Sequence, residues 1–117
     1  MNARDLDAIV ETFAECDIAA YADMSTAVTF LSAGQGEPGR EVLDQICALA
    51  ASNLGLPGKP PVGVAPSAMA IVSDAKYVHV FKRMPDEPSE ALSFRCLPGV
   101  DLSELLKSVD AVLDAAS

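Results

Sequence analysis

The stretch "MAIVSDAKYVHVFKRM", residues 69 to 84, contains the clearest β-hairpin pattern in the chain. Residues 69–73 and 76–84 are rich in β-branched and aromatic side chains, which favour strands. Asp74 and Ala75 separate the two runs, as the turn of a hairpin does. The sequence therefore predicts two neighbouring antiparallel strands at 69–73 and 76–84.

The second of these runs has apolar or aromatic side chains on both of its faces. Successive residues of a strand point to opposite sides, so Tyr77, His79 and Phe81 share one face. Val78 and Val80 occupy the other face. A strand that is covered on both faces belongs in the interior of a sheet with other elements packed above and below it.

Three further strands are predicted from the same residue preferences. Residues 18–22 and 27–31 flank the turn-forming segment "DMST", residues 23 to 26, and are typical of a second antiparallel hairpin. Residues 91–97 follow the proline-rich acidic turn "MPDEPSE" and form the fifth strand.

Three helices complete the prediction. Apolar residues recur at helical spacing in 5–15, 40–54 and 102–113, with polar residues on the other azimuths. Asp101 with Glu104 three residues later resembles a capping box at the start of the last helix. Each helix therefore has one apolar side that can pack on a sheet.

The resulting order is α-β-β-α-β-β-β-α in one domain, residues 1–117. We expect an α/β (α+β) fold with a central antiparallel five-stranded sheet, one helix on one face and two on the other. Residues 55–66, "GLPGKPPVGVAP", contain four prolines and three glycines, so they are expected to form a loop.

Composition excludes several classes of function. Half of the 117 residues are hydrophobic, so a single domain can bury a core without metals or cross-links. The formal net charge of −9 disfavours binding to nucleic acid and to anionic membrane surfaces. No apolar run is long enough for a signal peptide or a membrane span. We expect a soluble cytoplasmic protein.

The cysteines support the same expectation. Cys16, Cys47 and Cys96 are odd in number, widely spaced and without a C-x-x-C pair. Neither a disulfide framework nor a zinc site is indicated. We expect three buried free thiols and no metal.

The segment "LSAGQGEPGREVLDQ", residues 31 to 45, spaces three glycines as a dinucleotide-binding loop does. Glu37 and Pro38 stand where a phosphate loop needs backbone amides and a helix start. Arg40 and Glu41 stand where a P-loop has lysine and a hydroxyl residue. We therefore interpret the glycines as turn formers and expect no nucleotide or other cofactor.

No catalytic constellation is visible in the sequence. His79 is the one imidazole, and its neighbours in a predicted interior strand favour a packed, hydrogen-bonded side chain over a general base. The carboxylates of 5–15 and of 86–90 are typical of a solvated helix face and an acidic turn. We expect that the protein is not an enzyme.

The helix predicted at 40–54 has an unusually broad apolar arc. Its large residues lie along one side, while small residues such as Ala48 and Ala51 lie elsewhere and permit close approach of a second helix. Asn53 and Gly55 mark its end. An apolar surface that one sheet face cannot cover favours self-association through this helix in a two-fold dimer, although full burial within one chain is the alternative.

Four segments, "LDAIVETF", "VLDQICALAASNLG", "AMAIVSDAKYVHVFKR" and "DLSELLKSVDAVL", together with the order of the elements, resemble the roadblock/dynein light-chain superfamily of profilin-like domains. The resemblance extends from about Leu6 to Leu113. It implies a non-catalytic homodimer or heterodimer that acts as a scaffold or as a regulator of a small GTPase.

The resemblance also implies a dimer surface built from the middle helix and the third strand. By position, this surface comprises Val42, Ile46, Leu49, Ala50 and Asn53 on the helix, with Met69 and Ile71 on the strand.

A second hypothesis is a sensor domain of the profilin or PAS kind. Such a domain encloses a small ligand between its sheet and a helix. Tyr77, His79 and Phe81 would line that pocket.

Overall fold

The computed structural model describes residues 1–34, 36, 38–56 and 68–116. Its elements follow the predicted order α-β-β-α-β-β-β-α, which confirms the expected fold class. The helices are α1 (Ala3–Thr12), α2 (Arg40–Leu54) and α3 (Leu102–Ala116). The strands are β1 (Cys16–Asp23), β2 (Val28–Gly34), β3 (Met69–Ser73), β4 (Val78–Arg83) and β5 (Glu90–Cys96).

All five strands form one antiparallel sheet in the order β2-β1-β5-β4-β3. The 69–84 hairpin is present, with Ile71 opposite Val80. As predicted, β4 lies in the interior of the sheet, next to the central strand β5. β2 and β3 are the two edge strands, so each has one side that pairs with no other described strand.

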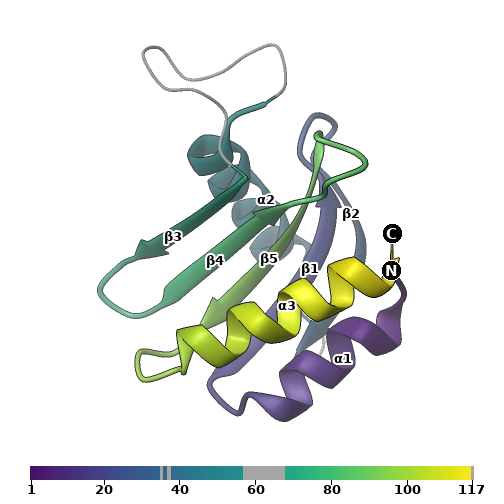
Figure 1. The fold of residues 1–117 in the computed structure, drawn as a ribbon. Coiled ribbons are helices and arrows are strands. Elements are labelled where there is room, and N and C mark those ends of the chain that lie inside the picture. Colours follow the sequence, from purple (N-terminus) through teal and green to yellow (C-terminus); the bar gives the residue numbers. More distant parts are fainter. Residues whose placement is uncertain (35, 37, 57–67, 117) are drawn as a thin grey trace.

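Helices cover both faces of the sheet. α1 and α3 lie side by side on one face, and α2 crosses the other (Figure 1). Each layer has its own apolar core. The layer under α1 and α3 contains Leu6, Ile9, Phe13, Ala19, Val80, Leu92, Phe94, Leu105 and Val109, and the layer under α2 contains Ile18, Met24, Ile46, Ala50, Leu54, Phe81 and Ala91. The predicted arrangement of one helix against two is therefore confirmed.

Several boundaries differ from the predicted ones because side chains close local turns. The second strand of the hairpin begins at Val78 rather than at residue 76. The Asp74 carboxylate accepts hydrogen bonds from the backbone N–H groups of Lys76 and Tyr77, at 2.8 and 2.7 Å. Those two residues therefore belong to the turn. β2 extends to Gly34, beyond the predicted end at residue 31 and into the segment interpreted as the glycine loop.

The helix ends are also set by local hydrogen bonds. α1 begins with a capping box between Asn2 and Asp5, which the prediction missed, and it ends at Thr12 rather than at residue 15. α3 begins after Asp101, whose carboxylate accepts from the N–H of Glu104 at 3.1 Å. That bond is one half of the capping box expected there.

The C-terminal end of α2 is tied to the sheet. Gly55 follows the helix with φ of 82°, as predicted for a glycine that ends a helix. Arg83, at the end of β4, donates hydrogen bonds from Nη2 to the carbonyls of Leu54 and Gly55, at 2.6 and 2.7 Å. This guanidinium satisfies carbonyls that the helix leaves without internal partners.

Candidate functional site

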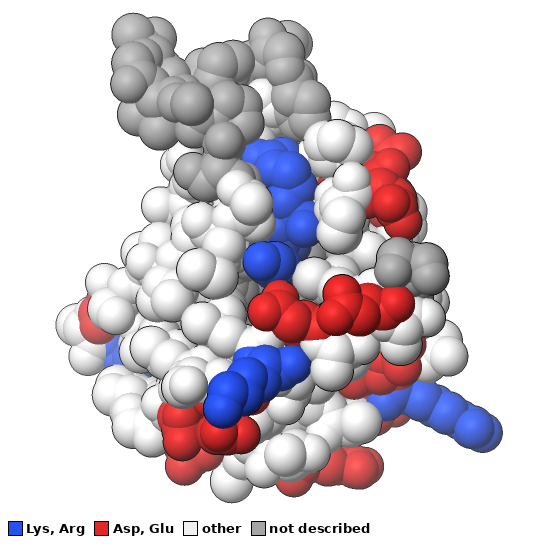
Figure 2. Space-filling view, viewed as in Figure 1, with Lys and Arg blue, Asp and Glu red and all other residues white. Residues whose placement is uncertain are grey.

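The edge strand β3 presents apolar side chains to solvent. Met69 and Ile71 are 40% and 42% exposed. Ala70 and Val72, which alternate with them, pack against the core under α2. Met69 and Ile71 therefore lie on the opposite face of the strand, the face that carries α1 and α3 elsewhere in the sheet. In Figure 2 the surface on the side of β3 is mostly uncharged, whereas charged side chains gather over α1 and α3.

The interface residues predicted on α2 divide into two groups. Ile46 and Ala50 are 4% and 1% exposed, because α2 lies on the sheet and these positions, four residues apart, point into the core. Val42, Leu49 and Asn53 are half-buried at the side of the helix. The prediction that this chain dimerises through these residues remains a prediction, but Ile46 and Ala50 offer almost no surface for it.

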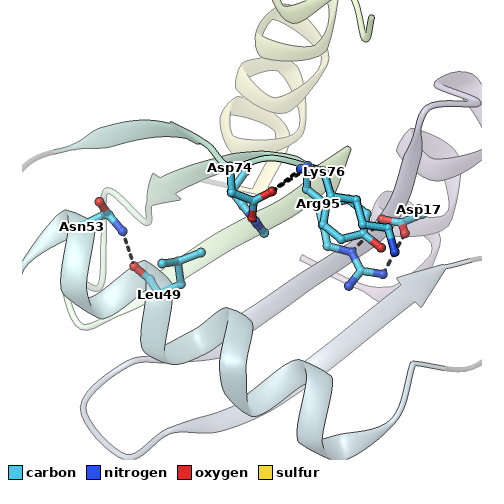
Figure 3. Close-up of polar contacts among 8 residues, drawn as sticks. Asp17, Leu49, Asn53, Asp74, Lys76 and Arg95 are labelled. Carbon is cyan, nitrogen blue, oxygen red and sulfur yellow. Dashed lines mark hydrogen bonds and ion pairs between the residues drawn. The ribbon is translucent and has the colours of Figure 1, made fainter. Parts of the chain in front are cut away.

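The side-chain amide of Asn53 is held within its own helix. Its Nδ2 donates to the carbonyl of Leu49 at 2.8 Å (Figure 3). This bond orients the amide along the side of α2 and leaves its oxygen as an acceptor.

A groove lies between α2 and the β3–β4 turn, with a volume of about 370 Å³. Its lining combines the apolar side of α2 with polar groups from the sheet. It comprises Val42, Gln45, Ile46, Leu49, Asp74, Tyr77, His79 and Arg95. Of the three pocket residues predicted for a ligand sensor, Tyr77 and His79 line this groove. Phe81 is fully buried in the core beneath α2 and is not part of the lining.

An ion pair supports the floor of the groove. Arg95 donates to both carboxylate oxygens of Asp17, from Nε at 3.1 Å and from Nη2 at 2.8 Å (Figure 3). This contact with Asp17 raises the pKa of Arg95. The guanidinium carbon also lies 4.2 Å from the centre of the Tyr77 ring, a cation–π geometry. Arg95 and Tyr77 are therefore held in fixed positions relative to each other.

His79 is buried and oriented by Asp74. Its Nε2 lies 3.2 Å from the Asp74 carboxylate, and its ring stacks on Phe81 with centres 5.9 Å apart. The amides of Lys76 and Tyr77, and then His79, lower the pKa of Asp74 to about 2, so the carboxylate is ionised at neutral pH. Nε2 therefore donates, and a neutral ring carries its free lone pair on Nδ1. Nδ1 has no hydrogen-bond partner among the described residues.

The three glycines near residue 36 have separate backbone roles. A Cβ on Gly34 would lie 2.6 Å from the carbonyl oxygen of Asp17, so the close approach of β2 to β1 requires glycine there. Gly36 has φ of 73°, and Gly39 is the N-cap residue of α2. The intervening residues 35 and 37 lie outside the described part of the chain, as does most of the predicted 55–66 loop.

The second edge strand, β2, also has exposed apolar side chains, which were not predicted from the sequence as a surface. Val28 and Phe30 on β2 are 48% and 47% exposed. Val28 and Phe30 lie on either side of Thr29, so the sequence itself shows that the two apolar side chains share one face of the strand. Beside them, a hollow of about 460 Å³ lies between β2 and the first turns of α2.

Neither a metal-binding cluster nor a membrane-spanning helix is found among the described residues. Residues 1–34, 36, 38–56 and 68–116 contain no group of three or more histidine, cysteine or acidic side chains that could hold a metal ion. None of the helices found in those residues has the length and apolar character that crossing a membrane requires.

Comparison with known proteins identifies the fold. No protein-family model and no curated protein matches the sequence. Among solved structures, a roadblock/LC7 domain from Streptomyces avermitilis superimposes with a TM-score of 0.77 at 11% identity, over 97% of this chain and 92% of that chain.

Two MglB structures are similar in the same way. MglB from Myxococcus xanthus has a TM-score of 0.72 at 14% identity, over 96% of this chain and 88% of that chain. An MglB with a tetrameric arrangement has a TM-score of 0.70 at 10% identity, over 96% and 82%. The chain therefore has a roadblock-like fold.

Proposed function

We propose that the chain is a non-catalytic, cytoplasmic protein-interaction module that forms a homodimer through α2 and the free edge of β3. As a dimer it acts as a scaffold or as a regulator of a small GTPase. The observation that carries this proposal is the edge strand β3, whose Met69 and Ile71 side chains are exposed.

An unpaired apolar edge favours pairing with another strand. Such an edge offers free N–H and C=O groups, and soluble proteins usually protect it with charges, prolines or a covering element. β3 has no charged residue and no proline between Met69 and Ser73. The same patch on two copies can meet about a two-fold axis, as in most homodimers.

Antiparallel pairing of two β3 edges also explains the predicted contribution of α2. It would continue the sheet across the axis and bring the two α2 helices to the same face. Val42, Leu49 and Asn53, half-buried in one chain, would then contact the second copy. Among structures of similar fold, one MglB has a tetrameric arrangement, which supports self-association of this fold in that protein.

Light scattering after size exclusion tests the dimer. The wild-type chain should elute near twice its mass of 12.2 kDa. Ile71→Lys should give a monomer, because it places a charge in the proposed contact while its own core stays intact. Val28→Lys is the matched control, since Val28 is equally exposed on the other edge strand and should leave the dimer unchanged.

A wild-type monomer at micromolar concentration would overturn the dimer. Equal effects of the two lysine variants would overturn the assignment to β3. Ile46→Asp is unsuitable as an interface test, because Ile46 lies in the core and an aspartate there would unfold the chain.

The regulatory role rests on the resemblance to the roadblock/dynein light-chain superfamily. Affinity purification from native lysate, with wild type compared with Ile71→Lys, should enrich a small GTPase with the dimeric form. Enrichment of other proteins without any GTPase would contradict this role.

The groove beside His79 favours a second candidate function, a small-ligand sensor. Its volume falls within the range of ligand pockets, and Tyr77 and Arg95 are pre-positioned along it. Native mass spectrometry of the purified protein should then show a bound small molecule that Tyr77→Ala loses. A ligand-free wild-type spectrum would contradict the sensor.

A further inference from the structure

Two of the three cysteines are cross-strand neighbours. Cys16 is the first residue of β1 and Cys96 the last residue of β5, and the two are paired in the register of the sheet. Both side chains are fully buried in the apolar layer under α1 and α3. The 79 intervening positions, 17 to 95, hide this proximity in the sequence.

The backbone hydrogen bonds define the type of pairing. The N–H of Leu97 donates to the carbonyl of Glu15 at 2.8 Å, which brackets Cys16 and Cys96 as a non-hydrogen-bonded pair. Cα atoms in such pairs lie about 4.5 Å apart, with their side chains close together. Disulfides join Cα atoms that lie about 4.4 to 6.8 Å apart. The usual Cα spacing of this type of pair therefore falls within the range that a disulfide requires.

The Cys96 thiol also affects the ionisation of Cys16. A hydrogen bond with the Cys96 thiol, followed by burial, raises the pKa of Cys16 far above its ordinary value. The Cys16 thiol lies 3.6 Å from the carbonyl of Ile18, to which it donates. In the folded, reduced chain the Cys16 thiol is therefore protonated and unreactive.

We propose that Cys16 and Cys96 are a modification site, a dithiol pair that an oxidising disulfide such as oxidised glutathione converts to a disulfide between β1 and β5. The site reacts when the end of the β1–β5 ladder opens. Cytosolic disulfides are commonly transient and redox-sensing, which suits a buried, reversible pair.

The disulfide would form by two successive thiol–disulfide exchange reactions. The thiolate of one cysteine attacks a sulfur of oxidised glutathione, forming a mixed disulfide and releasing one glutathione thiolate. The thiolate of the other cysteine then attacks the protein sulfur of that mixed disulfide and expels the second glutathione. The two cysteines lose two electrons in all, and their two protons end on two reduced glutathione molecules.

The position of the pair at the end of the β1–β5 ladder explains how an oxidant could reach two buried thiols. Cys16 and Cys96 are the terminal pair of the β1–β5 ladder, and the register is irregular immediately beside them, between Cys16 and Ile18. Ladder ends open locally at lower free energy than the centre of a sheet. Oxidation should therefore be slow in native buffer and faster in a low concentration of urea.

Cys47 provides the internal control. It is a buried residue of α2, on the opposite face of the sheet, and its thiol donates to the carbonyl of Asp23 at 3.7 Å. Cys47→Ser retains the proposed pair and removes the third thiol. Trypsin cleaves after Arg4, Arg40 and Arg95, so each cysteine of the wild type lies in a different peptide.

The full-length Cys47→Ser chain is incubated with oxidised glutathione, alkylated and analysed by intact mass and peptide mapping. We expect loss of both alkylatable thiols and a cross-linked peptide pair containing Cys16 and Cys96. The melting temperature should rise by roughly 5 °C or more, reversibly with dithiothreitol, because the bond closes a long loop. Cys96→Ala in the same background should show neither change.

If a variant fails to fold, peptide mapping of the oxidised wild-type chain still tests for the Cys16–Cys96 disulfide. Stable glutathione adducts, disulfides between chains, a Cys47 linkage or a lowered melting temperature would each overturn the proposal. Since the pair lies on the face away from α2, the inference is independent of the proposed dimer.

Discussion

One carboxylate organises the turn between β3 and β4. The Asp74 carboxylate accepts hydrogen bonds from two backbone amides and lies within hydrogen-bond distance of His79 Nε2, although its side chain is half exposed. Its pKa falls from 3.8 to about 2 chiefly because the amides of Lys76 and Tyr77 favour the charged form.

The pH dependence of stability follows from that shift. A carboxyl group whose folded pKa is depressed stabilises the fold at pH values above its unfolded pKa. The contribution of Asp74 should therefore be complete above about pH 4 and be lost as the pH falls toward 2. In Asp74→Asn, the midpoint of urea unfolding should be lower at neutral pH and should fall less between these pH values. If the urea midpoints of the wild type and of Asp74→Asn fell equally between these pH values, Asp74 would not be the source of the acid dependence.

At the level of secondary structure, Gly34 and Gly39, two of the described glycines that precede α2, differ in whether they can accept a side chain. Gly34 ends β2 against the backbone of β1, and an added Cβ would meet the Asp17 carbonyl oxygen at 2.6 Å. Gly39 caps α2 with φ of −70° and ψ of 153°, makes no side-chain cap bond, and has open space at its Cβ position.

These environments predict opposite effects of adding a side chain. Gly34→Ala should lower the free energy of unfolding by about 1–3 kcal/mol, because a strand must shift to admit the methyl group. Gly39→Ser should raise it by about 0.5 kcal/mol, because serine caps helix N-termini and restricts the unfolded chain. Urea unfolding followed by circular dichroism measures both changes. Destabilisation by Gly39→Ser would show that the N-cap geometry is wrong.

At the scale of the whole molecule, the sheet has two edges with exposed apolar side chains. Met69 and Ile71 mark β3, and Val28 and Phe30 mark β2. The proposed dimer uses the β3 edge, so the β2 edge would remain at both ends of the extended sheet.

Dimerisation would link stability to concentration. Because a dimer that binds only folded chains stabilises them by mass action, the melting temperature of the wild type should rise over a hundredfold increase in protein concentration. The Ile71→Lys variant should melt at one temperature throughout. Differential scanning fluorimetry provides the measurement, and a concentration-independent wild type would contradict a reversible dimer.

The sequence predicted the elements well because their signals are local. The alternation in 76–84 and the helical spacing in 40–54 each come from residues close together in the chain. Boundaries shifted where a side chain closed a turn, as Asp74 does before β4. The resemblance of the chain to roadblock domains likewise depended on this order of elements.

The candidate site was predicted only in part. The periodicity of α2 identifies its apolar side, but it does not say which of those residues the sheet covers. The structure buries Ile46 and Ala50 and leaves Val42 and Leu49 at the margin. The Met69 and Ile71 positions were named from the sequence, whereas their exposure depends on β3 being an edge strand.

Local sequence patterns were enough to predict the order of helices and strands, and the composition is acidic and half hydrophobic. Contacts between residues that are distant in the sequence depend instead on the tertiary fold: Asp17 with Arg95, Cys16 with Cys96, and Arg83 with the end of α2. Local periodicity records which side of an element a residue occupies. Strand order and register arise from packing of the whole chain, and they bring these residues together.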